Sequence, residues 1–412
     1  MTRSGTLVID ARDGAARSGV LHTAHGPVRV PGFMPVGTHA AVRACHPDEV
    51  RTSGADVLLC NAYHLALRPG VDLVERSGGL HRFIGWDGPI LTDSGGFQLV
   101  SLDGVAGVDD DAATFVSPYD GSRLRITPED AVRVQARLGA DILMCLDQPV
   151  AYGADAGAVS AATARTHRWA ERSRAVHPGE DRLLFGIVQG GFDPVLRRGS
   201  ARVIDALGFD GVAIGGLALG EPPPVMEAMA AAALADLPDS VPRYVMGLGT
   251  DAELLGMVAL GVDLFDCVLP TRLARNGTAL TATGRLPLRR TEARDDLAPV
   301  EAGCPCPACT RFSRAYLRHL FNAGEILAHR LLSLHNLTHV GRLMEAARRA
   351  IAAGRPRGRT HAAISPAGGS GGGRAGARAA PPQGRARAPP RRAERPALAA
   401  VHGLPPHACR AR

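Results

Sequence analysis

The chain has 412 residues, and its 47 basic residues, all of them arginine, exceed its 40 acidic ones to give a net charge of +7. The absence of lysine excludes Schiff-base catalysis and a lysine-bearing phosphate loop. No apolar run of about 18 residues is present, which argues against a membrane span. The N-terminus has no apolar signal-peptide core, so we expect a cytoplasmic protein.

The positive charge is concentrated at the C-terminus. Residues 354–412 contain 12 arginines and one acidic residue, a balance of +11, whereas residues 1–353 have a balance of −4. A basic excess is typical of proteins that bind polyanions. Here it belongs to an Arg/Ala/Pro/Gly-rich tail, which is too poor in apolar residues to offset the entropy of ordering, so we predict that residues 354–412 are disordered.

Short apolar, β-rich runs alternate with amphipathic helical stretches in the rest of the chain, which predicts parallel β–α units. A (β/α)8 TIM barrel and a doubly wound sheet are the alternatives. Polar residues and glycines follow the strand ends, where a barrel places its functional groups, and this favours the barrel. The expected strands are Asp56–Cys60, Ile90–Asp93, Ile142–Asp147, Leu183–Gln189, Val212–Gly216, Arg243–Gly247 and Val262–Val268.

The helix with the clearest start signal begins after Thr127, where a proline and two acids occupy the first turn, and it runs to Leu138. A long helical stretch is also predicted near the end of the body, from Arg314 to Ile351. The other expected helices are Val159–Val176, Asp193–Leu207, Pro224–Leu237 and Asp251–Leu260.

A C-x-C-x-x-C motif formed by Cys304, Cys306 and Cys309 indicates a metal site. Three thiolates and one imidazole make a closed tetrahedral zinc site, which is structural because no position is left for water. Three free thiols in a loop are the alternative. Several histidines follow in the helical stretch, and spacing alone does not choose among them.

Two aspartates are candidates for catalysis. Asp93 directly follows an apolar run and precedes two glycines, so it either faces a ligand at the barrel mouth or caps the next turn. Asp266 lies in an apolar strand, where an unpaired carboxylate is costly; it is either functional or buried with hydrogen-bond partners. Two carboxylates on separate strands suit double displacement at an anomeric carbon, one as nucleophile and one as acid/base.

Other segments are suited to a flat ligand and to phosphates. Glycines in 186–191, 214–221 and 246–247 allow the backbone to approach a ring closely, and a glutamine can read a purine edge. Arg272 and Arg275 lie just beyond the strand of Asp266 and either clamp phosphates or form a solvated rim.

Taken in order, these segments resemble the bacterial tRNA-guanine transglycosylases, the queuine tRNA-ribosyltransferase family. The resemblance runs from about Gly5 to Ala353. This family is a zinc-containing (β/α)8 barrel that exchanges the wobble guanine of certain tRNAs for a 7-deazaguanine. The motifs that carry the resemblance are TDSGGFQ, FGIVQGG, GGLALGE, YVMGLG, FDCVLPTRLARNG, CPCPAC, SRAYLRHLF and LLSLHNL.

The resemblance implies a role for each matching residue. Asp266 would be the nucleophile that attacks the ribose C1′ and forms a covalent ribosyl-enzyme, and Asp93 would be the general acid/base. Arg272 and Arg275 would contact the anticodon loop. The implied base-binding residues are Phe97, Asp147, Gln189, Gly216, Leu217, Met246 and Gly247. The implied ligands of one structural zinc ion per subunit are Cys304, Cys306, Cys309 and His335.

The resemblance also implies the organisation and the partners of the protein. Residues 1–353 would form the catalytic barrel, with a zinc-binding subdomain and terminal helices in residues 278–353. The expected partners are a tRNA with a GUN anticodon, a 7-deazaguanine base and a second copy of the chain in a homodimer. We expect no membrane partner.

The chain departs from the family pattern at three places. Asp147 is followed by Gln-Pro-Val instead of the common Glu-Cys-Thr. Leu219 stands where eukaryotic members have glycine and would crowd the cyclopentenediol of queuine, which implies a preference for 7-aminomethyl-7-deazaguanine. The basic tail after Gly354 is either the product of a reading-frame change in a GC-rich gene, with a passive role, or an RNA-binding extension.

Two other functions are compatible with parts of the pattern. A non-catalytic tRNA-binding subunit of the same fold would tolerate loss of an active-site acid, but Asp93 and Asp266 are both present. A retaining glycosidase barrel needs only two acids, and it leaves the cysteine cluster, the glycine segments and the arginines unexplained. The transglycosylase is therefore the favoured prediction.

Overall fold

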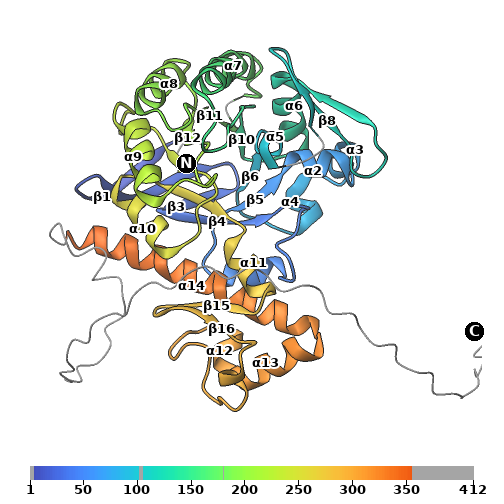
Figure 1. Cartoon of the computed structure of the whole chain (residues 1–412), viewed down its shortest axis with the longest axis vertical. Coiled ribbons are helices and arrows are strands. Elements are labelled where there is room, and N and C mark those ends of the chain that lie inside the picture. Colours follow the sequence, from blue (N-terminus) through green and yellow to red (C-terminus); the bar gives the residue numbers. More distant parts are fainter. Residues whose placement is uncertain (1–3, 102–104, 180, 355–412) are drawn as a thin grey trace, which may run out of the picture. The chain divides into compact units, whose positions relative to one another are not determined.

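Eight parallel strands close into a barrel in a computed structural model, which describes residues 4–101, 105–179 and 181–354 (Figure 1). This confirms the predicted (β/α)8 barrel and rules out the doubly wound sheet. In order around the barrel, the strands are β4 (Gly32–Gly37), β5 (Leu58–Asn61), β6 (Ile90–Asp93), β10 (Ile142–Met144), β11 (Leu183–Val188), β12 (Gly211–Ile214), β13 (Arg243–Val245) and β14 (Leu264–Cys267).

The sequence patterns located seven of these strands and missed β4. Pro35 interrupts its apolar residues and a glycine stands at each end, and glycine and proline are both disfavoured in strands. In the structure β4 pairs with β14 on one side and with β5 on the other. The strand that sequence propensity did not predict is therefore the one that closes the barrel.

The five helices predicted between Thr127 and Leu260 lie close to their predicted positions, whereas the short helices α1 to α5 were not predicted. Thr127 caps α6 with a full capping box, because its side chain accepts a hydrogen bond from the N–H of Asp130 and the Asp130 side chain accepts one from the N–H of Thr127. The helices between the strands are α1 (Pro47–Thr52), α2 (Ala62–Leu67), α3 (Val71–Arg76), α4 (Gly79–Ile84), α5 (Gln98–Ser101), α6 (Pro128–Leu138), α7 (Ala156–Ala175), α8 (Pro194–Ala206), α9 (Pro223–Leu234) and α10 (Asp251–Ala259).

The predicted single helical stretch from Arg314 to Ile351 is wrong. It consists of two helices, α13 (Arg314–Ala323) and α14 (Ile326–Ala352), separated at Gly324. Gly324 adopts a left-handed conformation with φ of 76°, which ends a helix and which glycine adopts without steric cost. The break was not predicted because both helices bury apolar residues, so the amphipathic pattern continues on both sides of Gly324.

Helix α14 is the last helix of the barrel and contacts β4 and α1. The segment between β14 and α14 forms an inserted subdomain, drawn in yellow and orange in Figure 1. Among the described residues, two three-stranded antiparallel sheets outside the insertion and a two-stranded one within it were not predicted. The elements of the insertion are α11 (Leu269–Arg275), β15 (Thr278–Thr281), β16 (Gly284–Pro287), η1 (Thr291–Ala293), α12 (Pro307–Arg311) and α13. The strands of the small sheets are β1 (Leu7–Asp13), β2 (Ala16–Thr23), β3 (Gly26–Val30), β7 (Val105–Val108), β8 (Ala113–Val116) and β9 (Arg123–Ile126).

Two buried aspartates fix the amino-terminal ends of the strands. Asp263, just before β14, accepts hydrogen bonds from the guanidinium of fully buried Arg17 and from the backbone N–H of Arg243. Asp141, just before β10, contacts the rings of His25 and His81 at 2.7 and 3.0 Å. These groups lie at the end of the barrel opposite to the carboxyl ends of the strands, and their hydrogen bonds link the first sheet to the barrel.

None of the described helices is both long and apolar enough to span a lipid bilayer. The predicted disordered tail, apart from Gly354, lies outside the described residues.

Candidate active site and metal centre

A cavity of about 470 Å³ lies at the carboxyl ends of the barrel strands. Its lining comes from the residues that end β4, β5, β6, β13 and β14, and from the loops that follow these strands, β10 and β12. The lining includes both candidate acids and most of the residues predicted to bind the base. These are Asp93, Phe97, Asp147, Gly216, Leu217, Met246, Gly247 and Asp266.

Asp93 is the last residue of β6 and is half-buried at the cavity wall. Its carboxylate accepts hydrogen bonds from the backbone N–H of Ala62, at 3.1 Å, and from the Asn61 side chain. Desolvation nevertheless raises the pKa of Asp93 to about 8, and the negative charges of Asp266 and Asp147 add to this increase. Asp93 is therefore mainly protonated at neutral pH.

Asp266 lies in β14 and has a different hydrogen-bonding environment. Its Oδ1 accepts a hydrogen bond from the Tyr244 hydroxyl, at 2.6 Å, and one from the backbone N–H of Gly247, at 2.9 Å. Desolvation raises the pKa of Asp266, and these two hydrogen bonds oppose the increase because they stabilise the anion. No described residue donates a hydrogen bond to Oδ2, so this oxygen is available to a ligand.

Asp147 and Gln189 form a buried polar pair beside the acids. The Gln189 Nε2 donates a hydrogen bond of 2.6 Å to Asp147 Oδ2, so Gln189 lies behind the cavity wall rather than in its lining. Desolvation raises the pKa of Asp147 to about 6. A Cβ atom at Gly96 would lie 2.0 Å from Asp147 Oδ1, and one at Gly216 would lie 2.4 Å from Gln189 Oε1. Only glycine fits at these two positions, which explains why the sequence motifs contain it.

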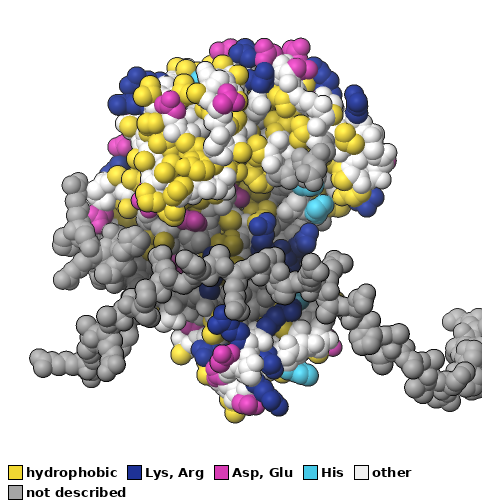
Figure 2. All heavy atoms as spheres, viewed as in Figure 1, with side chains coloured by type: hydrophobic (Ala, Val, Ile, Leu, Met, Phe, Trp, Pro, Cys, Tyr) yellow, Lys and Arg dark blue, Asp and Glu magenta, His cyan; other side chains and the backbone are white. Residues whose placement is uncertain are grey.

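Arginines lie on the side of the cavity nearest the inserted subdomain. Arg272 lines the cavity and is exposed, whereas Arg275 is half-buried one turn further along α11. Burial, together with the positive charges of Arg43 and Arg272, lowers the pKa of Arg275. These three arginines therefore lie close together. Figure 2 shows basic side chains in dark blue gathered between the barrel and the inserted subdomain.

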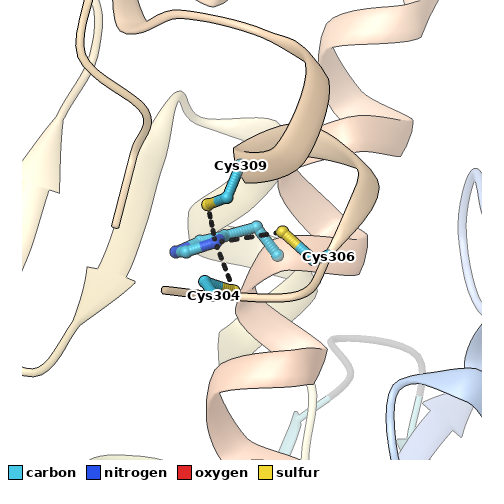
Figure 3. Close-up of side chains that lie close together, drawn as sticks. Cys304, Cys306 and Cys309 are labelled. Carbon is cyan, nitrogen blue, oxygen red and sulfur yellow. Dashed lines mark hydrogen bonds between the residues drawn. The ribbon is translucent and has the colours of Figure 1, made fainter. Parts of the chain in front are cut away.

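Three cysteines and one histidine form a cluster in the inserted subdomain (Figure 3). The Nδ1 atom of His335 lies 3.7, 3.5 and 3.2 Å from the sulfur atoms of Cys304, Cys306 and Cys309. In a tetrahedral zinc site, bonds of about 2.3 Å to sulfur and 2.0 Å to nitrogen place sulfur and nitrogen about 3.5 Å apart. The cluster therefore has the size and the donor set to hold such an ion.

The orientation of the histidine in this cluster is determined by a second contact. The Nε2 atom of His335 lies 2.8 Å from the backbone carbonyl oxygen of Leu280, so Nε2 carries the proton and Nδ1 is free to bind a metal. His335 is fully buried on α14, whereas the cysteines lie in the loop before α12 and within it. A metal here would join the insertion to α14, the last helix of the barrel.

Comparisons with known proteins assign the chain to a family. The family described as Queuine tRNA-ribosyltransferase matches residues 12–360. Proteins named queuine tRNA-ribosyltransferase from Solidesulfovibrio magneticus and Nitratidesulfovibrio vulgaris are each 50% identical to the chain over 357 residues. That alignment covers 86% of the chain and 96% and 95% of those proteins. The relative from Gloeobacter violaceus is 49% identical over 358 residues.

The chain belongs to the queuine tRNA-ribosyltransferase family. The predicted family and the predicted enzyme class, a pentosyltransferase, are thereby confirmed. The roles assigned to individual residues remain predictions. What the structure contributes is their placement, because it brings all the predicted base-binding residues except Gln189 into the lining of one cavity with the two acids.

Three residues that line the site or lie directly behind it were not predicted from the sequence of this family member. Asn61 follows an apolar run as Asp93 does, so the rule that identified Asp93 applies equally to Asn61. Tyr244 lies inside a strand and gives no sequence signal, because a buried tyrosine is usually a core residue. Arg197 is also buried behind the cavity and lies in an ordinary helical pattern.

From the four donors of the cluster we predict one bound metal ion per chain. Replacing Cys306 with alanine removes a thiolate ligand, and we expect the metal content to fall below about one tenth of the intact value. Elemental analysis of the dialysed protein by mass spectrometry measures this. The control is Cys45→Ala, since Cys45 is half-buried and outside the cluster; it should leave the metal content unchanged. An intact chain without metal would contradict the prediction.

Proposed function

We propose that the chain exchanges the wobble guanine of tRNAs with a GUN anticodon for a 7-deazaguanine base, in queuosine biosynthesis. The main support is the placement of two carboxylates with different hydrogen-bonding environments, Asp93 and Asp266, in the lining of one cavity large enough for a purine. The names of the relatives support the same reaction class.

In the proposed first step, Oδ2 of Asp266 attacks C1′ of the ribose. The C1′–Oδ2 bond forms while the bond from C1′ to N9 of guanine breaks, and the electron pair of that bond leaves with guanine. Protonated Asp93 transfers its proton to the departing base. Asp266 is suited to be the nucleophile because the hydroxyl of Tyr244 and the N–H of Gly247 stabilise its anion and leave Oδ2 free.

The second step reverses the first with a different base. The carboxylate of Asp93 removes the proton from N9 of the incoming 7-deazaguanine, N9 attacks C1′, and the ester bond to Asp266 breaks. Two successive inversions retain the configuration at C1′. Asp93 suits both directions because its pKa of about 8 lies near neutral pH, so both protonation states are accessible.

Recognition of the base is assigned to the residues that surround the acids. Asp147 would present its carboxylate to the edge of the ring, together with the peptide groups of Gly216 and Leu217. Gln189 would contribute from behind the wall through its hydrogen bond to Asp147. Phe97, which is 53% exposed at the cavity mouth, and Met246 would cover the two faces of the ring. The target base must leave the anticodon stack to reach this cavity.

The remaining parts of the proposal concern the tRNA, the metal and the assembly. Arg272 and Arg275 would contact phosphates of the anticodon loop, since guanidinium groups bind phosphate in a bidentate manner. Zinc is the metal proposed for the Cys304, Cys306, Cys309 and His335 cluster, where it would stabilise the inserted subdomain. We further propose that the chain acts as a homodimer in the cytoplasm.

The proposed reaction predicts incorporation of labelled guanine into a tRNA with a GUN anticodon. Removing the nucleophile with Asp266→Ala should reduce the rate by more than about a thousandfold. The control Asp236→Asn changes an aspartate paired with Arg198 and outside the cavity lining, and it should retain the intact rate. No incorporation by the intact chain would favour a non-catalytic tRNA-binding subunit instead.

The pKa of Asp93 predicts a decline in rate at alkaline pH. The first step needs protonated Asp93, so kcat/KM for tRNA should be constant at neutral pH and fall as the pH rises through about 8. Asn61→Ala removes a hydrogen bond that stabilises the Asp93 anion, so it should raise the pKa of Asp93 and shift the decline to higher pH. A decline that does not move in this variant would contradict the assignment to Asp93.

From the position of Leu219 we predict which incoming base is preferred. This half-buried residue lines the cavity, where its side chain would meet the cyclopentenediol of queuine but not the aminomethyl group of 7-aminomethyl-7-deazaguanine. We expect exchange with the aminomethyl base to be faster by about tenfold or more, and Leu219→Gly to reduce this difference. Competition assays with both bases measure it. Equal exchange with queuine by the intact chain would contradict the preference.

A further inference from the structure

Arg197 is a buried cation directly behind the candidate base-binding wall. It lies in the first turn of α8, its side chain is inaccessible to solvent, and it does not line the cavity. Among the described residues it forms no ion pair. Its guanidinium instead donates hydrogen bonds to three backbone carbonyl oxygens, those of Gly191 at 2.7 Å, Gly215 at 2.9 Å and Gly216 at 3.1 Å.

This arrangement is costly for a group that serves only packing. Burial lowers the pKa of Arg197 to about 10, so the guanidinium still carries its charge at neutral pH, while the negative charge of Glu221 opposes the decrease. An arginine without a carboxylate partner is stabilised in the interior only if its N–H groups find acceptors. Here the acceptors belong to the loops that follow β11 and β12, so the guanidinium ties these two loops together.

The hydrogen bonds of Arg197 also determine which way two peptide groups face. A trans peptide directs its C=O and N–H groups to opposite sides. Because Arg197 holds the carbonyl oxygens of Gly215 and Gly216, the N–H groups of Gly216 and Leu217 are directed away from the guanidinium. Gly216 and Leu217 both line the cavity, and no acceptor for these two N–H groups is found in the described part of the chain.

The same loops hold the buried amide of Gln189. Gly216 has a φ of +65° and would place any Cβ atom 2.4 Å from Gln189 Oε1. That oxygen is buried and has no hydrogen-bond partner among the described residues. A shift of Gly216 would therefore change the direction of the peptide N–H groups. It would also change the distance between the Gly216 backbone and the Gln189 side chain.

We infer that Arg197 is a positioning residue for recognition of the base: it holds the peptide groups of Gly215 and Gly216 so that two backbone N–H donors face the incoming ring. The inference rests on the proposed function, in which a purine-like base binds in this cavity. Arg197 itself does not touch the base. It acts on the affinity of the cavity for a base, free or in the tRNA, and leaves the arginine contacts with the anticodon loop unchanged.

The test compares Arg197→Met and Arg197→Lys with the intact chain. Two measurements are made: equilibrium dialysis of guanine with the free protein, and separate KM values for guanine and for tRNA in the exchange assay. We expect Arg197→Met to weaken guanine binding and to raise the KM for guanine by about tenfold or more, because two oriented donors are lost. The KM for tRNA should rise by a clearly smaller factor, since the wobble guanine loses the same donors while the arginine contacts with the anticodon loop remain.

Arg197→Lys should give an intermediate effect, because an ammonium group donates hydrogen bonds but lacks the planar fork that spans two carbonyl groups. It also provides the test if Arg197→Met does not fold, which thermal unfolding checks. The matched control is Arg198→Met, one position further along α8. Arg198 is exposed and paired with Asp236, so its replacement should change neither KM.

Each alternative result has a defined meaning. If the KM for tRNA rises by the same factor as the KM for guanine, or if guanine binding is unchanged in both Arg197 variants, the residue has only a structural role and the inference is overturned. An intact chain that binds no guanine overturns it as well. If the intact chain binds guanine but does not exchange it, the proposed function fails, and guanine binding by the variants still decides the role of Arg197.

Discussion

Desolvation of carboxylates is the constraint on which the candidate site depends. Asp93, Asp147 and Asp266 all line one cavity, and loss of water favours their neutral forms. The hydrogen bonds that each carboxylate accepts then determine how strongly its anion is stabilised. The donors from Tyr244 and Gly247 favour the anion of Asp266, whereas the surroundings of Asp93 leave its pKa near 8. Two residues of the same type thereby become suited to the two roles that we propose for them, nucleophile and general acid/base.

The barrel supplies the second requirement, which is rigid placement. The carboxyl ends of β6 and β14 bring Asp93 and Asp266 to one cavity although 172 positions separate them in the chain. Backbone groups near the acids are held just as firmly, since Arg197 anchors the carbonyl oxygens of Gly215 and Gly216. Glycines at 96 and 216 allow side chains of neighbouring strands to approach closely. Close approach of neighbouring side chains is therefore one reason for the glycines in the site.

The net charge of the whole chain does not describe the charge of the part that forms the site. The overall value of +7 suggests a polyanionic partner, yet the part of the chain that forms the barrel and the insertion has a balance of −4. The arginines at 43, 272 and 275 lie close together at the side of the cavity. Recognition of a nucleic acid by such a surface depends on where the cations lie, because screening limits each charge to about 10 Å in solution of moderate ionic strength.

Local sequence patterns alone determined seven strands of the barrel, the helices α6 to α10, the cysteine motif and the two candidate acids. Each of these is set by residues that are neighbours in the chain. The tertiary structure decided what depends on contacts between distant segments. It added β4, whose proline and glycines hide a strand that its two neighbours stabilise, and it divided the last helical stretch at Gly324. It also supplied the partners that distinguish Asp93 from Asp266, and the carbonyl groups around Arg197, because no local pattern records which groups meet when the barrel closes.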